Sequence, residues 1–203
     1  MRIGIFGGTF DPPHIGHISA CKAFLERVEL DVLYIIPVYM PPHKNIHSGT
    51  SEADRLEMAK LAFSPLSDKI FVSDLEIKRG GRSYTADTIK QIKSENDNAE
   101  IFFLCGTDMI LTMDLWYKPE YIFANATIVY ARRESEHEIT EKIAKKCDFY
   151  KEKYGASIIY TENDAIEASS TEIRKAITEN NVGSGLLSKP VFDYVINKNL
   201  YKS

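Results

Sequence analysis

The amino-acid sequence predicts an α/β fold, a doubly wound parallel sheet followed by a small C-terminal helical extension. Short runs rich in β-branched and aromatic residues alternate with stretches of helical periodicity from the first residues onward. A strand that is joined to the next strand through a helix packs as a right-handed crossover, which builds a parallel sheet covered on both faces. A glycine turn also follows the first predicted strand, at the kind of position where such sheets bind ligands.

The alternation predicts six strands and five longer helices. Strands are expected at residues 2–6, 32–37, 70–73, 100–105, 126–131 and 157–160. Helices are expected at residues 17–28, 52–63, 86–95, 136–154 and 171–179. The second helix should begin with a capping box, because Ser51 is followed three residues later by Asp54. Leu56, Ala59, Lys60 and Phe63 then recur at helical spacing, with Lys60 as the polar exception.

The length and composition predict one ordinary globular domain. The 203 residues are enough for a single domain with its own core, whose C-terminal helical part is expected at about residues 169–203. The N-terminus lacks the features of a signal peptide, and no stretch approaches the roughly 18 apolar residues of a membrane helix. We therefore expect a cytoplasmic protein with no membrane partner.

Charge and cysteine content restrict the partners further. The net charge of −4 argues against nucleic acid, so an anionic ligand would have to meet a local cluster of cationic groups. Cys21, Cys105 and Cys147 are odd in number and lie far apart, which predicts neither disulfides nor a metal site. Cys21 and Cys105 are expected to be small core residues. A homo-oligomer can be argued neither for nor against from the sequence.

The segment GGTFDPPHIGH, residues 7–17, carries the strongest functional signal. Gly7 and Gly8 end the first strand, so the backbone could turn there with positive φ and approach a ligand closely. His14 and His17 stand three residues apart at the start of the next helix, which places both rings on one side. A helix N-terminus offers unpaired N–H groups to phosphate, and imidazole donors could contact the same oxygens. We therefore expect this loop to bind phosphate.

Three other interpretations fit parts of this loop. A His-x-x-His zinc pair would need further ligands, and no nearby Cys or Glu completes one. A dinucleotide-binding loop would show GxGxxG, whereas Gly4, Gly7 and Gly8 are spaced differently. A structural turn with surface histidines would explain one histidine alone, but not the combined pattern.

The same string resembles the nucleotidyltransferase signature GGxFDPxHxGH, and it closely resembles the bacterial nicotinate-nucleotide adenylyltransferases. The resemblance implies a Rossmann-like fold and catalytic roles for His14 and His17. It also implies an ATP site that includes Gly7, Gly8, Thr9, Phe10 and Gly16. The tetrapeptide HIGH occurs in class I aminoacyl-tRNA synthetases as well, but their KMSKS loop and tRNA-binding appendages are missing from this sequence.

Two segments that follow later strands resemble the same family. The segment PPHK, residues 41–44, implies that Lys44 is a catalytic, phosphate-contacting group and that His43 contacts the nicotinate nucleotide. The segment SYTADT, residues 83–88, resembles the family's SYTxDT and implies that Thr85 helps to hold the nicotinate carboxylate. Considered alone, this segment predicts a helix capped by Thr85 whose N–H groups could receive an anion.

A GxD segment and a tryptophan follow the fourth predicted strand. A lone tryptophan such as Trp116 is more often a core residue than a ligand platform. The resemblance implies instead that Trp116 stacks on the pyridine ring, with Tyr117 beside it in the nicotinate nucleotide site. It also implies that Gly106 and Asp108 belong to the ATP site, where Asp108 would accept hydrogen bonds from ribose hydroxyls or help to position the metal.

The segment SSTEIR, residues 169–174, has the pattern of a helix start, with hydroxyl caps followed by an acid. Arg174 fits that pattern poorly, because a cation in the first turns opposes the helix dipole. An anion docked on the N-terminus would reverse that penalty. The segment resembles the family's SSTxIR motif, which implies that Ser169, Ser170 and Arg174 grip the ATP phosphates, with Arg174 as a catalytic group. Ala168 departs from the β-branched residue that is usual there.

The chemistry that these residues imply needs no covalent intermediate, and no Ser–His–Asp or Cys–His arrangement is evident. A phosphate monoester is largely dianionic near neutral pH and can attack the α-phosphorus of ATP once it is held in line. The resemblance implies that ATP and nicotinate mononucleotide give deamido-NAD and pyrophosphate, a step of NAD biosynthesis. Mg²⁺ would be carried mainly by the ATP phosphates.

Several alternatives stay open at this point. The acceptor could be phosphopantetheine or another phosphorylated alcohol, although that family has Thr in place of His14 and lacks the features at Trp116 and SYTxDT. A cytidylyltransferase would prefer CTP. A nucleotide-sensing module with an inactive site fits poorly with the presence of His14, His17 and Arg174. Nicotinate and nicotinamide differ by one carboxylate-to-amide exchange, which changes only a few contacts.

Overall fold

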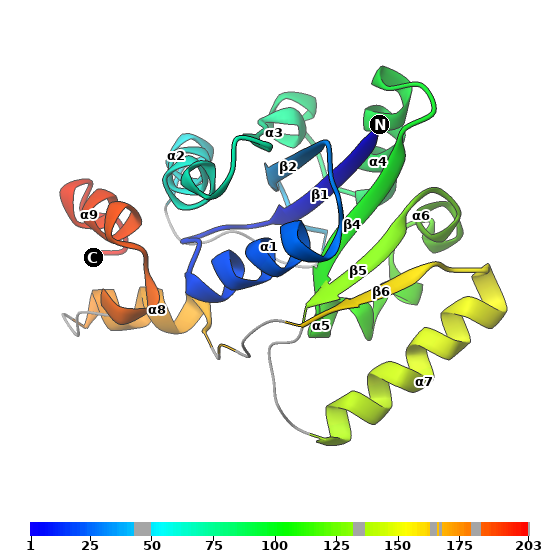
Figure 1. Ribbon diagram of the computed structural model, residues 1–203. Coiled ribbons are helices and arrows are strands. Elements are labelled where there is room, and N and C mark those ends of the chain that lie inside the picture. The colour runs from blue at the N-terminus through cyan, green and yellow to red at the C-terminus, as the bar shows by residue number, and fades with distance from the viewer. Residues whose placement is uncertain (43–49, 132–136, 163–165, 167, 180–183, 203) are drawn as a thin grey trace.

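The computed structural model describes residues 1–42, 50–131, 137–162, 166, 168–179 and 184–202. Within these residues the centre of the molecule is a six-stranded parallel sheet with the order β3-β2-β1-β4-β5-β6 (Figure 1). The strands are β1 (Arg2–Gly8), β2 (Val32–Pro37), β3 (Ile70–Val72), β4 (Glu100–Gly106), β5 (Thr127–Ala131) and β6 (Ile158–Thr161). The strand order reverses between β1 and β4, so their carboxyl ends form the switch point where doubly wound sheets bind ligands.

Helices join the strands and cover both faces of the sheet (Figure 1). The α-helices are α1 (Ile15–Arg27), α2 (Glu52–Phe63), α3 (Leu75–Arg79), α4 (Thr85–Glu95), α5 (Thr107–Ile110), α6 (Pro119–Asn125), α7 (His137–Tyr154), α8 (Ser170–Thr178) and α9 (Lys189–Asn197). Single 3₁₀ turns are η1 (Ser64–Leu66), η2 (Met113–Leu115) and η3 (Ser184–Leu186). The helices α8 and α9 form the predicted C-terminal extension, and α9 packs against α2.

The predicted elements are confirmed over the described residues, with strand ends that differ by one or two residues. The first helix begins at Ile15, earlier than predicted, because His14 already occupies the N-cap position. The helices α3, α5 and α6 were not predicted, since elements this short hold too few turns to show a hydrophobic period.

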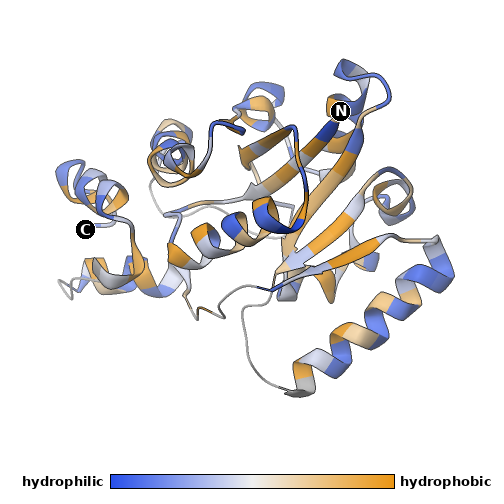
Figure 2. Ribbon diagram, viewed as in Figure 1, coloured by the Kyte–Doolittle hydropathy of each residue, from blue (hydrophilic) through white to orange (hydrophobic). Residues whose placement is uncertain are grey.

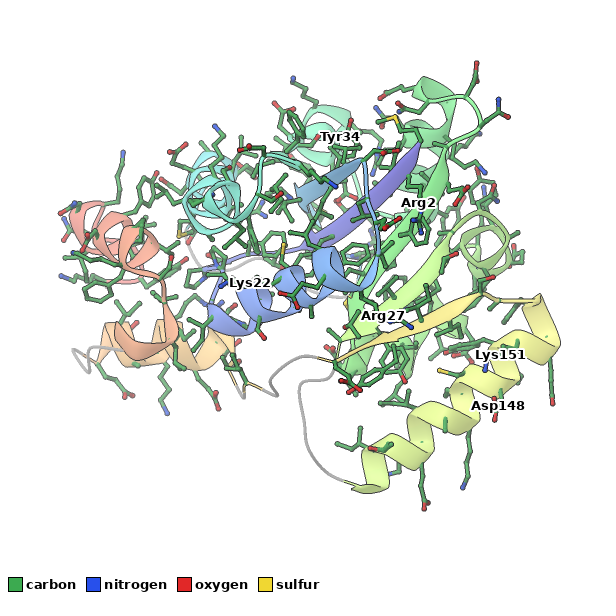
Figure 3. The ribbon with its side chains drawn as sticks, viewed as in Figure 1. Arg2, Lys22, Arg27, Tyr34, Asp148 and Lys151 are labelled. Atoms are coloured by element: carbon green, nitrogen blue, oxygen red, sulfur yellow. The ribbon has the colours of Figure 1, made fainter. Side chains whose placement is uncertain are left out.

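The two faces of the sheet pack into two separate hydrophobic cores. Along β1, Ile3 and Ile5 enter the core formed with α4, α6 and α7, whereas Phe6 enters the core formed with α1, α2, α8 and α9. Burial on both faces explains why the strands are largely apolar along their length (Figure 2). By contrast, Asp148 and Lys151 on the outer side of α7 form an exposed ion pair of 3.6 Å (Figure 3). None of the described helices is long and apolar enough to cross a membrane.

Helix α2 begins as predicted and buries part of the predicted face. The Asp54 N–H donates to Ser51 Oγ at 3.1 Å, and the Ser51 N–H donates to Asp54 Oδ2 at 3.3 Å, which is a capping box. Ala59 and Phe63 are buried as predicted, whereas Leu56 is only partly buried. The buried residues are Arg55, Met58, Ala59, Ala62 and Phe63. An arginine can lie on the buried face here because its guanidinium finds backbone partners near the cavity.

The cysteines are core residues, as expected for Cys21 and Cys105. All three cysteines are free and buried. Burial raises the pKa of the Cys21 thiol to about 12, and burial also raises the pKa of Cys105 and Cys147. The neutral thiols therefore act as small apolar groups.

Candidate active site

A cavity of about 720 Å³ opens at the carboxyl end of the sheet, over the ends of β1 and β4. Its wall combines the loop after β1 with the N-terminal ends of α1, α4, α5 and α8. The predicted site residues that line it are Gly7, Gly8, Thr9, Phe10, His14, His17, Thr85, Gly106, Asp108, Trp116, Tyr117, Ser169, Ser170 and Arg174. Gly16 lies behind His14 rather than on the wall. The predictions for His43 and Lys44 fall outside the described residues.

The two glycines at the end of β1 do not form a left-handed turn, which corrects the prediction, and Gly8 instead allows close packing. Gly7 and Gly8 belong to β1, and positive φ occurs instead at Phe10, where φ is 48°. A Cβ on Gly8 would lie 2.8 Å from the Phe10 ring, which is itself 1% exposed. The Phe10 ring packs edge-on against Phe6 and at an angle of 65° against Phe63. Gly8 therefore lets the first loop fold down onto its own strand.

His14 and His17 lie together at the start of α1, as predicted. Their ring centroids are 3.7 Å apart and the rings are inclined by 32°. The backbone N–H of His14 donates to His17 Nδ1 at 3.2 Å, so a neutral His17 ring carries its proton on Nε2. A Cβ on Gly16 would lie 3.1 Å from His14 Nδ1, and glycine at this position therefore makes room for the His14 ring.

Helix α8 holds the first loop from the other side of the cavity. The Arg174 guanidinium donates through Nη1 to the Asp11 carbonyl oxygen at 2.7 Å. The Ser170 hydroxyl donates to the Pro12 carbonyl oxygen at 2.9 Å. Ser169 occupies the N-cap position but makes no side-chain capping bond. The prediction that these hydroxyls cap the helix was therefore wrong for Ser169, which makes no capping bond, and for Ser170, which already lies inside the helix.

Arg55 is a buried cation beside this loop that the sequence did not single out. It is 1% exposed and donates to the carbonyl oxygens of Thr9 at 3.2 Å and Val38 at 2.6 Å. These two residues follow β1 and β2, so one guanidinium fixes the spacing of both strand ends. Burial lowers the pKa of Arg55, and the negative charge of Asp11 opposes that shift. The sequence feature that could have indicated a buried Arg55 is its position one helical turn before Met58, on the helix face that is buried.

Aromatic side chains line the part of the cavity over the other face of the sheet, since Trp116 packs on the core of α4, α6 and α7, whereas Phe10 beside His17 belongs to the other core. Trp116 packs edge-on against Phe103, with centroids 6.2 Å apart, and is partly exposed on the cavity wall. Tyr84 and Tyr117 lie 4.5 Å apart, inclined by 37°. Thr85 is the first residue of α4 and Tyr84 is its N-cap, so the prediction that Thr85 caps the helix was wrong. The start of α4 nevertheless lies on the cavity wall beside these rings.

Carboxylates also reach the cavity. Asp108 is exposed on α5, and Glu76 on α3 is 5% exposed. The Thr88 hydroxyl donates to Glu76 Oε1 at 2.5 Å, and Arg79 lies 3.7 Å from the same carboxylate. Glu76 was not predicted, since its partners on α4 are not evident from its own short segment. Among the described residues no group of three or more His, Cys, Asp or Glu side chains could hold a metal ion.

The arrangement is suited to polyanionic ligands. The N-termini of α1, α4 and α8 all lie on the cavity wall, where the first N–H groups of each helix carry partial positive charge. The histidine pair and Arg174 add side-chain donors at the same end of the cavity. The site can thus hold phosphates at one end and a flat ring at the other.

Comparisons with known proteins identify the family. The cytidylyltransferase-like family model matches residues 5–176. A relative from Borreliella burgdorferi, named as a nicotinate-nucleotide adenylyltransferase, is 36% identical over 203 residues, which cover 99% of this chain and 97% of the relative. A relative of the same name from Halalkalibacterium halodurans is 32% identical, with coverage of 100% and 92%.

Solved structures share the fold. The nicotinic acid mononucleotide adenylyltransferase of Plasmodium falciparum, in complex with NaAD, has a TM-score of 0.76 at 22% identity, with 98% of this chain and 97% of that chain covered. The same protein in complex with APC has a TM-score of 0.74 at 22% identity, with 98% of this chain and 96% of that chain covered. The family match over most of the sequence, together with relatives that align along its whole length, shows that this chain belongs to the nicotinate-nucleotide adenylyltransferases, within the cytidylyltransferase-like nucleotidyltransferases.

Proposed function

We propose that this chain transfers the adenylyl group of ATP to nicotinate mononucleotide, giving deamido-NAD and pyrophosphate in NAD biosynthesis. The observation that carries the proposal is the single cavity that joins His14, His17 and Arg174 at one end to Trp116 and Tyr117 at the other. The names of the full-length relatives support the same reaction.

The chain's own residues would act by positioning and by stabilising charge. An oxygen of the mononucleotide phosphate forms a bond to the α-phosphorus of ATP, and the bond from that phosphorus to the bridging oxygen breaks as pyrophosphate leaves. His17 Nε2–H and Arg174 would donate to phosphate oxygens on which charge grows in the transition state. The start of α8, with Ser169 and Ser170, would receive the outer phosphates. Gly7, Gly8 and Thr9 would lie along the nucleotide.

A divalent cation belongs to this reaction, and we propose Mg²⁺, bound mainly by the ATP phosphates. When bound, it would neutralise charge on the departing pyrophosphate. The exposed Asp108 carboxylate on the cavity wall fits such a cation, because Mg²⁺ usually keeps several waters that an acid can accept from.

We propose nicotinate rather than nicotinamide as the ring. Thr85 and the N–H groups at the start of α4 favour a carboxylate over a neutral amide, because a helix N-terminus attracts negative charge. Trp116 and Tyr117 would contact the pyridine. We also propose that residues 1–203 form one domain, that the protein is cytoplasmic, and that it binds neither nucleic acid nor a membrane. His43 and Lys44 also remain proposed site residues.

Pyrophosphate release tests this function. The purified chain with Mg²⁺ should release pyrophosphate fastest with ATP and nicotinate mononucleotide. Nicotinamide mononucleotide, phosphopantetheine and CTP in place of the matching substrate should each give a much lower kcat/KM. A preference for phosphopantetheine or CTP would overturn the acceptor or the donor, and binding without release would indicate a sensing module.

His17→Ala tests the site. Loss of a donor to the transition-state phosphate should lower kcat by about a hundredfold or more. Urea unfolding and circular dichroism should show a folded protein, since His17 is only partly buried. A folded His17→Ala protein with near-normal turnover would show that the assigned role is wrong.

A further inference from the structure

The C-terminal residues fold back so that Tyr201 reaches the first loop. Asn199 and Tyr201 both have positive φ, 51° and 63°, which turns the chain sharply after α9. The Leu200 N–H donates to the Val195 carbonyl at 3.0 Å, and the Thr178 hydroxyl donates to the Tyr201 carbonyl at 2.7 Å. These bonds fix the tail against α8 and α9. The phenol of Tyr201 then donates to Asp11 Oδ1 at 2.7 Å.

Asp11 is a buried carboxylate whose two oxygens have different surroundings. Its side chain is 3% exposed, and Oδ1 accepts the Tyr201 hydrogen bond. Oδ2 lies 4.0 Å from Arg174 Nη1, which donates instead to the Asp11 carbonyl oxygen at 2.7 Å. Arg55 is another cation near Asp11, and its Nη1 is already bound to the carbonyl oxygens of Thr9 and Val38. The Arg174 guanidinium is therefore only loosely paired with the Asp11 carboxylate.

The phenol is a dependable donor in this position. Burial and the neighbouring Asp11 carboxylate raise the pKa of Tyr201, so the hydroxyl keeps its proton over the range in which enzymes work. Without the Tyr201 hydroxyl, Asp11 Oδ1 would be a buried, charged oxygen that has lost this hydrogen bond, which costs free energy. A shift of about 1 Å would bring the Arg174 guanidinium into a charge-assisted bond with this carboxylate.

We propose that Tyr201 is a positioning residue of the ATP site: its hydroxyl satisfies Asp11, which keeps the Arg174 guanidinium directed to the cavity and able to receive phosphate. The inference rests on the proposed function only in that Arg174 binds ATP. Nothing in it depends on the identity of the acceptor. Tyr201 itself does not touch the substrate and acts through Asp11 and Arg174.

Tyr201→Phe removes the hydroxyl and keeps the ring. The chain offers a matched control, because Tyr194 on α9 also donates to a carboxylate, Asp54 Oδ1 at 2.9 Å, away from the first loop. Tyr201→Phe should raise the KM for ATP about tenfold, the effect of losing one bond to a charged group, and leave the acceptor KM unchanged. Tyr194→Phe should change neither constant.

Two further measurements separate positioning from general destabilisation. The Kd for ATP, measured without acceptor by competition with a fluorescent ATP analogue, should rise in Tyr201→Phe by the same factor as KM. In the double variant Tyr201→Phe/Asp11→Asn most of the ATP affinity should return, because a neutral amide draws the guanidinium far less than a carboxylate does. A merely structural tyrosine would show no such rescue.

The outcomes are distinct. An unchanged ATP Kd in Tyr201→Phe, an equal rise for Tyr194→Phe, or no rescue by Asp11→Asn would each overturn the positioning role. Failure of the unaltered protein to transfer the adenylyl group would overturn the proposed function, while the ATP Kd values would still decide the role of Tyr201.

Discussion

The clearest separation of activity from stability is expected at Gly16. An Ala Cβ there would lie 3.1 Å from His14 Nδ1, 3.2 Å from His14 Cε1 and 3.4 Å from the Ile166 carbonyl oxygen. Comfortable contacts begin near 3.5 Å, so the His14 ring must move by about 0.4 Å. Misplacing a catalytic group by about 1 Å can lower the rate about a hundredfold, and this smaller shift should therefore lower kcat roughly fivefold to tenfold.

The free energy of unfolding should rise slightly or stay unchanged in Gly16→Ala. Gly16 lies in the first turn of α1, where Ala is preferred over Gly by up to about 1 kcal/mol. That gain should offset the cost of moving the His14 ring, so the free energy of unfolding should stay near its original value.

Steady-state pyrophosphate release and urea unfolding measure the two effects on the same preparation. Gly185→Ala in η3 is the matched control, because its Cβ would meet no atom of the described residues within 4 Å and kcat should not change. An unchanged kcat in Gly16→Ala would refute the reasoning that Gly16 makes room for His14. A loss of stability larger than about 2 kcal/mol would refute it as well, since something other than the ring would then have moved.

Two further predictions concern the fold. Gly8→Ala should lower the free energy of unfolding by about 1–3 kcal/mol because the buried Phe10 ring lies 2.8 Å from the new Cβ. In Gly7→Ala the nearest atom is 3.9 Å away, and an equal loss there would contradict this explanation. Ser51→Ala should cost about 1 kcal/mol at pH 7 through the lost cap. The Ser51 hydroxyl holds the pKa of Asp54 below its ordinary value, so the difference between the proteins should shrink below about pH 4, which urea unfolding at pH 7 and pH 3 would test.

The strands could be predicted because parallel strands buried on both faces are almost continuous apolar runs, as in β4. The long helices could be predicted from their caps and periods, as at Ser51 in α2. Helix α5 could not, because its four residues complete little more than one turn. The burial of Arg55 in α2 was missed for another reason, since apolar periodicity cannot identify a buried cation.

In the site, too, local patterns could be predicted, whereas contacts between distant residues could not. Residues of the first loop and of the α8 start could be predicted because each motif is local in the sequence, and the sheet then brings the motifs to one edge. The residues that support these motifs, Arg55 and Tyr201, could not be predicted. Arg55 lies 46 residues from Thr9, and Tyr201 lies 190 residues from Asp11. Such contacts are properties of the folded chain: the spacing of Arg55 from Met58 indicates its helix face but not its partners, and no local pattern marks Tyr201.

The helix that is proposed to grip ATP is also the helix that holds the histidine loop. Ser170 and Arg174 both donate to carbonyl oxygens of the first loop. A ligand that recruits these donors would therefore act on the position of Asp11 and Pro12, just ahead of His14. On the proposed function, ATP binding and the placement of the histidine pair would be one linked equilibrium rather than two separate events. This linkage explains why the most distant part of the chain, the tail at Tyr201, can matter to a loop that begins at Gly7.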